Sequence, residues 1–155
     1  MNSDLYLEKN ISQQPAIDLL TAMGYTYISP ADCDKQRGSR YHVLLRDILR
    51  GQLRRLNRYA YAGAENEFSA ANIERAMEDL DEPLTDGLVR TSEKIYDALL
   101  LGKSYPETVG EGKMLSFNLR YIDWDNPQNN VFHVTEEFAV DSRDRQHNAR
   151  PDIVL

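Results

Sequence analysis

Residues 121–155 read YIDWDNPQNNVFHVTEEFAVDSRDRQHNARPDIVL, and this stretch indicates how the C-terminal part of the chain folds. Residues 131–140 alternate between apolar and polar side chains, which is the period of a half-buried β-strand. A cluster of turn-forming residues, 125–130, precedes this segment. The stretch ends with Asp152, a lone carboxylate directly before the apolar run 153–155. We therefore predict a sheet in this region, with an aspartate at the start of its last strand.

The alternation begins near residue 104, and the chain before that point follows the period of a helix. Apolar residues recur at intervals of three and four in segments that we predict to be helices, namely residues 4–23, 42–58, 68–80 and 86–101. Gly24 and Gly102 stand just after the first and the last of these segments, where glycine commonly ends a helix. Residues 29–41 are expected to be a polar connection and residues 59–67 a loop.

These patterns predict an α+β fold in which N-terminal helices, within residues 1–103, pack on a mostly antiparallel sheet built from residues 104–155. The chain has 155 residues, of which 41% are hydrophobic and 28% are charged. That size and composition are ordinary for one globular domain with a real core, so we expect a single domain over residues 1–155.

The composition also limits the class of function. The formal net charge of -7 argues against nucleic-acid binding by bulk charge, but it allows a local basic face. The single cysteine, Cys33, forms no internal disulfide and lies between two aspartates, which disfavour a reactive thiolate. No apolar run reaches the length of a membrane span, and the N-terminus lacks the features of a signal peptide. We therefore expect a cytoplasmic protein with no membrane contact.

A local basic face is present in the predicted helix over residues 42–58, where Arg46, Arg50 and Arg54 recur every four residues. One interpretation is a solvated face beside the apolar stripe of the same helix. The other is a DNA-contacting face, because the forked donors of guanidinium groups match phosphate oxygens.

Asp152 allows two interpretations as well. A Pro-Asp pair is common in turns, so the residue can be a simple turn aspartate. An aspartate at the start of a buried strand is also a sound first ligand for a hard divalent cation in a nuclease, because the strand fixes its position. Glu136 and Glu137 lie on the preceding strand, and one of them is a candidate second carboxylate; we select Glu137 as the catalytic candidate beside Asp152. The alternative is that both are surface glutamates of the strand.

A family resemblance favours the metal-ligand interpretation. Three passages carry the resemblance, in the same order as in the family. The first is QQPAI (13–17) with LL (19–20) and GY (24–25), and the second is residues 45–57, which end in RLN. The third comprises ID (122–123), NP (126–127), NN (129–130), Phe132, Val134 and Phe138, followed by RPDIVL (150–155). With these passages, the chain resembles the N-terminal nuclease region of the R (restriction) subunit of type I restriction enzymes. The resemblance spans almost the whole chain, and its last passage is the most specific.

The resemblance implies a restriction-endonuclease-like fold with a P-D…(D/E)-x-K site. Asp152 matches the aspartate of this motif and would be a Mg²⁺ ligand. The acidic-x-Lys half is expected on the next strand, beyond Leu155, so the core and its active site are expected to be incomplete here. Gln13 stands where the family often has Glu, which would make it a weaker, neutral ligand.

We therefore hypothesise an N-terminal fragment of a type I site-specific deoxyribonuclease. The whole protein would cleave DNA with Mg²⁺ after ATP-driven translocation, with the ATP site outside this chain, and would assemble with modification and specificity subunits. The fragment itself is expected to be inactive. An exposed sheet edge at its C-terminus predicts a homodimer through that edge.

The alternative hypothesis is a complete, non-catalytic module that binds DNA or a partner subunit. Arg46, Arg50 and Arg54 would form its contact surface, and Asp152 would be only a turn residue.

Overall fold

The computed structural model describes residues 12–81, 83, 87–141 and 148–155. Within these ranges the α-helices are α1 (Gln14–Ala22), α2 (Pro30–Arg37), α3 (Arg46–Leu56), α4 (Ala70–Leu80) and α5 (Leu88–Leu101). The strands are β1 (Thr26–Tyr27), β2 (Arg58–Tyr61), β3 (Ala64–Glu67), β4 (Lys103–Val109), β5 (Lys113–Leu119), β6 (His133–Glu136), β7 (Val140–Asp141), β8 (Asn148–Ala149) and β9 (Ile153–Val154). The predicted α+β class is confirmed, with five helices in these ranges and small, mostly antiparallel sheets.

In the described part of the chain, the strands form one three-stranded sheet and three two-stranded sheets. The three-stranded sheet has the order β1-β6-β9, in which β1 is parallel and β9 antiparallel to β6. The other pairs, β2-β3, β4-β5 and β7-β8, are antiparallel. The expectation of one sheet over residues 104–155 is wrong, because β6 pairs with a strand from the N-terminal part of the chain. Alternation along a strand predicts which face is buried, but it does not identify the partner strand.

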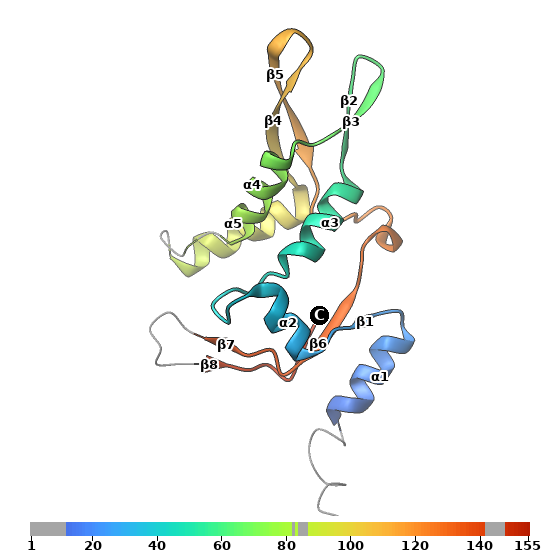
Figure 1. Cartoon of the computed structure of the whole chain (residues 1–155), viewed down its shortest axis with the longest axis vertical. Helices are drawn as coiled ribbons and strands as arrows, with labels where there is room; N and C mark the ends of the chain where they lie inside the picture. Colours follow the sequence, from blue (N-terminus) through green and yellow to red (C-terminus); the bar gives the residue numbers. More distant parts are fainter. Residues whose placement is uncertain (1–11, 82, 84–86, 142–147) are drawn as a thin grey trace, which may run out of the picture. The chain divides into compact units, whose positions relative to one another are not determined.

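The chain divides into two compact units, the first with residues 1–45 and 131–155 and the second with residues 46–130. In the first unit α1 and α2 both pack beside β6 (Figure 1). Its buried apolar side chains come from all three elements and from the turn after β6, and they are Ile17, Cys33, Val134 and Phe138. The prediction of a single domain over residues 1–155 stays a prediction.

Helix α2 occupies most of the segment that we expected to be a polar connection, so that expectation is wrong. Ser29 begins the helix, because its hydroxyl accepts a hydrogen bond from the backbone N–H of Asp32 at 3.1 Å. Pro30 takes the first helical position, where its missing N–H has no cost. Only Cys33 and Arg37 are buried, so the helix lacks the apolar stripe by which helices are recognised in a sequence.

Arg37 ties α2 to the turn that follows β6. Its guanidinium forms an ion pair with Asp34 and donates to the backbone oxygen of Ala139, each at 2.5 Å. The same group lies 4.0 Å from the centre of the Phe138 ring, a cation–π contact. Since the Arg37 side chain is fully buried, these partners replace the water that it loses on folding.

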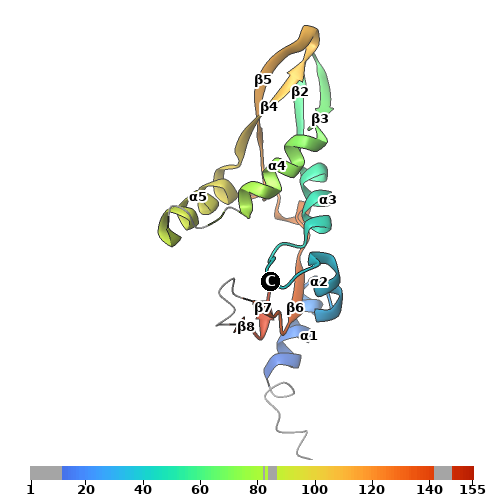
Figure 2. The same ribbon diagram turned by 60° about the vertical axis from the view of Figure 1, so that its left-hand side comes forward.

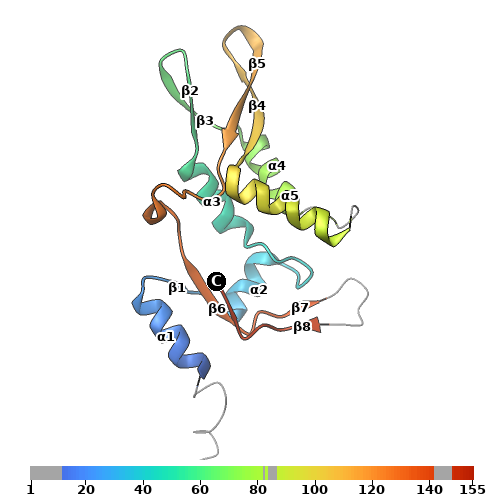
Figure 3. The same cartoon turned by 180° about the vertical axis from the view of Figure 1, so that it is seen from behind.

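The second unit packs α3, α4 and α5 against two hairpins. Its core contains Leu53 of α3, Ile73 and Met77 of α4, Tyr105 of β4 and Leu119 of β5. The three helices predicted for this unit are confirmed, although α3 begins at Arg46 rather than at residue 42. Both hairpins extend in the same direction from the helices (Figures 2 and 3).

Hairpin β2-β3 replaces the loop expected over residues 59–67, and that expectation is wrong. The turn is Ala62-Gly63, and both residues have positive φ, 51° and 81°. Asn-Gly is the common signal for such a turn, so the sequence lacked it. Tyr59 stacks on Phe117 of β5, with ring centres 4.3 Å apart, and this contact joins the two hairpins.

The N-terminal helix is confirmed in part. Helix α1 covers residues 14–22 of the segment predicted over residues 4–23, and residues 4–11 lie outside the described residues. Within the described ranges, every helix falls short of the length or the apolar character that crossing a membrane requires.

Candidate functional site

Asp152 lies directly before β9, at the end of the three-stranded sheet, as the sequence predicts. Its side chain is exposed, and none of the hydrogen bonds and ion pairs among the described residues uses its carboxylate. Its backbone oxygen, in contrast, accepts two hydrogen bonds, from the Gln13 side chain at 2.8 Å and from the Glu137 N–H at 3.1 Å. The backbone of this residue is therefore fixed, while its carboxylate points into solvent and stays open to a ligand.

Gln13 connects the N-terminal segment to this point of the sheet. It immediately precedes α1 and is only 7% exposed, so its amide is held in place by packing. The amide nitrogen donates to the Asp152 backbone oxygen across 139 positions of sequence. In this structure Gln13 thus orients the peptide of Asp152.

Glu137 lies opposite Asp152, one residue after β6 ends. Its φ of 53° is in the left-handed region, which non-glycine residues rarely adopt, and this turn interrupts the strand expected over residues 131–140. Its carboxylate forms an ion pair with Arg150, whose side chain is 65% exposed. The backbone N–H of Glu137 donates to the backbone oxygen of Asp152, so the two catalytic candidates are neighbours.

Glu136 is the buried carboxylate of the same region. It is 8% exposed and pairs with Ile153 of β9 in the ladder. The Tyr27 hydroxyl of β1 donates to its Oε1 at 3.0 Å. Burial, with this hydrogen bond as the second cause, raises the pKa of Tyr27, so the phenol stays a proton donor at neutral pH.

The arrangement fits a divalent cation in the type of its ligands. Mg²⁺ prefers oxygen ligands and is often held by only one or two carboxylates, with water and phosphate oxygens completing its shell. Asp152 offers one exposed carboxylate, and Glu137, whose backbone N–H binds the Asp152 backbone oxygen, is the candidate for a second. No group of three or more His, Cys, Asp or Glu side chains in the described part of the chain is placed to hold a metal ion. Metal binding at Asp152 therefore stays a prediction.

The arginine face of α3 lies in the other unit. Arg46 and Arg50 form ion pairs with Glu74 of α4, at 3.3 and 2.5 Å. The pKa of Glu74 lies below its usual range, chiefly because Arg50 donates hydrogen bonds to its carboxylate. Arg50 also pairs with Asp47, whereas Arg54 is exposed. Two of the three predicted DNA-binding arginines are therefore engaged in joining α3 to α4.

The turn before β6 is a closed network around Asp123. This residue is 3% exposed and accepts hydrogen bonds from the Asn129 side chain at 2.9 Å and the Asn126 backbone N–H at 3.1 Å. The Asn129 bond is the main reason why the pKa of Asp123 lies below its usual range. Asn130 accepts from the Asp123 N–H and donates to its backbone oxygen, both at 2.9 Å. These residues build the turn and do not form part of the region around Asp152.

Asn57 has a similar structural role. It is 4% exposed, and its amide donates to the backbone oxygens of Leu53 and Arg120 at 2.9 and 2.8 Å. Its side-chain oxygen accepts from the Arg120 N–H at 2.7 Å. Asn57 thus ends α3 and attaches it to the residue after β5.

Sequence reasoning missed Tyr27 as part of this region. The segment around it is visibly β-prone, which is the one signal that could have found it. Its hydrogen-bond partner Glu136 is 109 positions away in sequence, and the parallel pairing of β1 with β6 brings the two side chains together.

The family model described as type I restriction enzyme R protein N terminus matches residues 5–155. Neither the curated proteins nor the solved structures contain a match.

Proposed function

The chain belongs to the family of type I restriction enzyme R protein N-termini, and on this premise we propose that it supplies the first metal ligand of a DNA-cleaving site. The family is a nuclease family of restriction systems, whose enzymes typically need Mg²⁺ and act on DNA within a restriction complex. The proposed activity of the whole protein is Mg²⁺-dependent endonucleolytic cleavage of DNA coupled to ATP-driven translocation.

The observation that carries this proposal is the setting of Asp152. Its backbone oxygen is held by Gln13 and by the Glu137 N–H, and its carboxylate is exposed. A catalytic ligand needs this combination, because the supporting residues fix its position while its oxygens remain free to bind. A simple turn aspartate would not require a buried glutamine from the other end of the chain to hold its peptide.

In the proposed mechanism Asp152 is the first ligand for Mg²⁺, and Glu137 is a candidate second carboxylate. A bound Mg²⁺ would polarise the scissile phosphate and lower the pKa of a water molecule. Gln13 positions the Asp152 peptide through its amide. Arg150 neutralises Glu137 and keeps its side chain beside the same strand end.

The partners proposed for the whole protein follow from the family. They are duplex DNA and the modification and specificity subunits of a restriction complex. ATP would bind to a motor region that we assign outside residues 1–155.

Cleavage assays on supercoiled plasmid with Mg²⁺ test this function. We expect no cleavage by the purified 155-residue chain, because in the described part of the chain no lysine contacts Asp152 or Glu137 to orient the attacking water. We expect cleavage, dependent on ATP, when the chain is part of an R subunit assembled with its partner subunits. Specific cleavage by the 155-residue chain alone, if it depended on Asp152, would contradict the proposal that this chain carries only the first part of the active site. Absence of cleavage by the assembled complex would refute the function.

The second candidate, a non-catalytic DNA-binding module, rests on the arginines of α3. It predicts that the 155-residue chain binds duplex DNA with an affinity that falls steeply with salt, and that changing Arg46, Arg50 and Arg54 to Glu abolishes binding. Because Glu74 already pairs with two of these arginines, we expect weak binding at most. The matched control is Arg90→Glu on α5. The binding module would be favoured over the nuclease if DNA affinity fell steeply with salt in the unchanged chain and in Arg90→Glu, and if only the α3 variant lost this binding.

A further inference from the structure

Helix α5 exposes a row of large apolar side chains on the side away from the core. Its inner side is defined by Thr91 and Ala98, which are buried. On the outer side Val89, Tyr96 and Leu100 are 70%, 64% and 45% exposed. These positions follow one another at intervals of seven and four residues, so they form one stripe along the helix.

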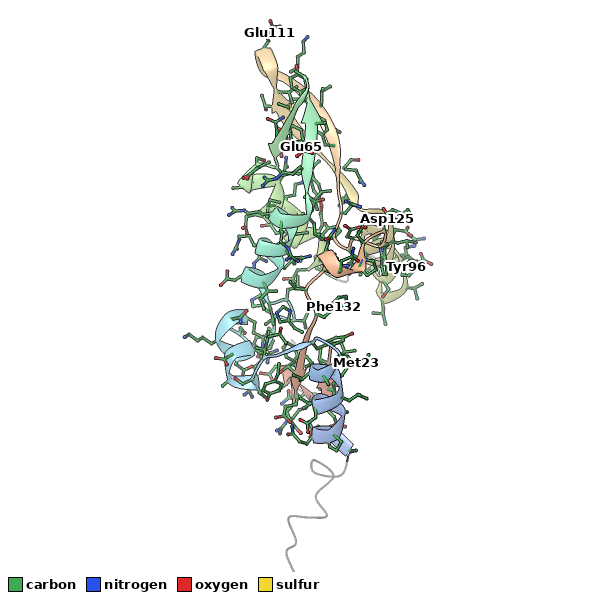
Figure 4. All side chains as sticks on the ribbon, turned by 90° about the vertical axis from the view of Figure 1, so that its right-hand side faces the viewer. Met23, Glu65, Tyr96, Glu111, Asp125 and Phe132 are labelled. Carbon is green, nitrogen blue, oxygen red and sulfur yellow. The ribbon has the colours of Figure 1, made fainter. Side chains whose placement is uncertain are left out.

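A further exposed aromatic side chain, on the loop after β5, lies against the same helix. Trp124 is 57% exposed, and its indole N–H donates to the backbone oxygen of Leu99 at 3.0 Å, which places the ring against α5. Figure 4 labels Tyr96 on this helix and Asp125 on the loop that also carries Trp124. Contiguous exposed apolar side chains that include aromatic rings are typical of the centre of a protein interface.

The charges on α5 identify the partner that fits this stripe. Arg90, Glu93, Lys94 and Asp97 are exposed, two basic and two acidic, so the helix is neutral although the chain carries a net charge of -7. Positions at the seam of a coiled coil recur at alternating intervals of three and four residues. Val89, Tyr96 and Leu100 fit this pattern, and Glu93 takes the seam position between Val89 and Tyr96. A two-fold axis requires a surface that is complementary to itself.

We propose that α5 packs antiparallel against α5 of a second copy of this chain. In that arrangement Val89 lies opposite Leu100 of the other copy, and Glu93 lies opposite the Tyr96 hydroxyl, which can donate to it. Arg90 and Asp97 stand on the same flank of the stripe, so each meets the opposite charge across the axis. The helix has 14 residues, about 21 Å at 1.5 Å per residue, which gives a small interface. Its dissociation constant is therefore on the order of tens of micromolar.

Sedimentation equilibrium of the 155-residue chain, from micromolar to several hundred micromolar, tests this proposal. The chain should change from monomer to dimer over this range, and Tyr96→Glu should keep it monomeric at every concentration. Met114→Glu is the matched control, because Met114 is equally exposed, at 66%, but lies on β5, and it should dimerise like the unchanged chain.

A charge exchange tests the antiparallel geometry itself. Arg90→Asp and Asp97→Arg should each weaken the dimer about tenfold, and the double exchange should restore it, since both pairs are then again of opposite sign. The charge exchange tests the antiparallel dimer even if Tyr96→Glu disturbs folding. A monomer at all concentrations would overturn the proposal. So would a dimer that tolerates Tyr96→Glu but is lost with Leu155→Glu, which would place the contact at the β9 edge expected from the sequence.

Discussion

Replacing Asp152 by alanine is expected to lower DNA cleavage by the assembled restriction complex about a thousandfold. This factor corresponds to about 4 kcal/mol of transition-state stabilisation, the order expected when a metal ligand is removed. Folding should be unaffected, because the side chain is exposed and the contacts of this residue use its backbone. The measurement is the rate of linearisation of a plasmid that carries the recognition sites, with ATP hydrolysis followed in the same reactions.

The matched control is Asp125→Ala, which removes an aspartate whose side chain is 85% exposed in the turn before β6. This variant should cleave at the unchanged rate. ATP hydrolysis should persist in both variants, since the proposed motor lies outside this chain. Cleavage by Asp152→Ala within a few-fold of the unchanged complex would mean that Asp152 is a turn residue only.

Replacing Arg37 by alanine is expected to lower the free energy of unfolding by about 3 kcal/mol. The guanidinium is fully buried and contacts Asp34, the backbone oxygens of Ala139 and His42, and the Phe138 ring, so the change removes four contacts together. Removing one partner from a buried, hydrogen-bonded ion pair commonly costs this much, because the groups left behind lose their compensation. Urea unfolding followed by circular dichroism measures the difference.

Arg40→Ala is the control for this variant, because Arg40 binds the same Asp34 carboxylate but its side chain is 54% exposed. It should cost less than about 1 kcal/mol, as exposed ion pairs do. Equal losses for the two variants would show that the burial of Arg37 does not matter.

The sequence predicted those elements whose signal is local. Helices α3, α4 and α5 have apolar stripes, Ser69 caps α4, and Gly102 ends α5 as expected. Helix α2 was missed because it is polar and buries only Cys33 and Arg37, so its signals lay only at its ends, in Ser29 with Pro30 and in Gly38. Hairpin β2-β3 was missed because its Ala-Gly turn is an uncommon choice for two residues of positive φ.

For the candidate site, the position of Asp152 before a short strand was predictable, but its surroundings were not. The contact of Gln13 with the Asp152 backbone and that of Tyr27 with Glu136 each join residues more than 100 positions apart. Such contacts depend on the pairing of β1 and β9 with β6, which the period of a single strand does not specify. The bend at Glu137 depends on a backbone conformation that its residue type disfavours.

Metal binding at Asp152 is tested most directly by Mn²⁺ titration of the ¹⁵N-labelled 155-residue chain, followed through its amide resonances. Mn²⁺ takes the oxygen ligands that suit Mg²⁺ and broadens the resonances of nearby amides. We predict that broadening at low Mn²⁺ is strongest for Glu137, Asp152 and Ile153, and that Asp152→Asn removes it while the remaining spectrum is unchanged. Broadening that is centred elsewhere, or that is the same in the Asp152→Asn variant, would contradict the assignment of Asp152 as a metal ligand.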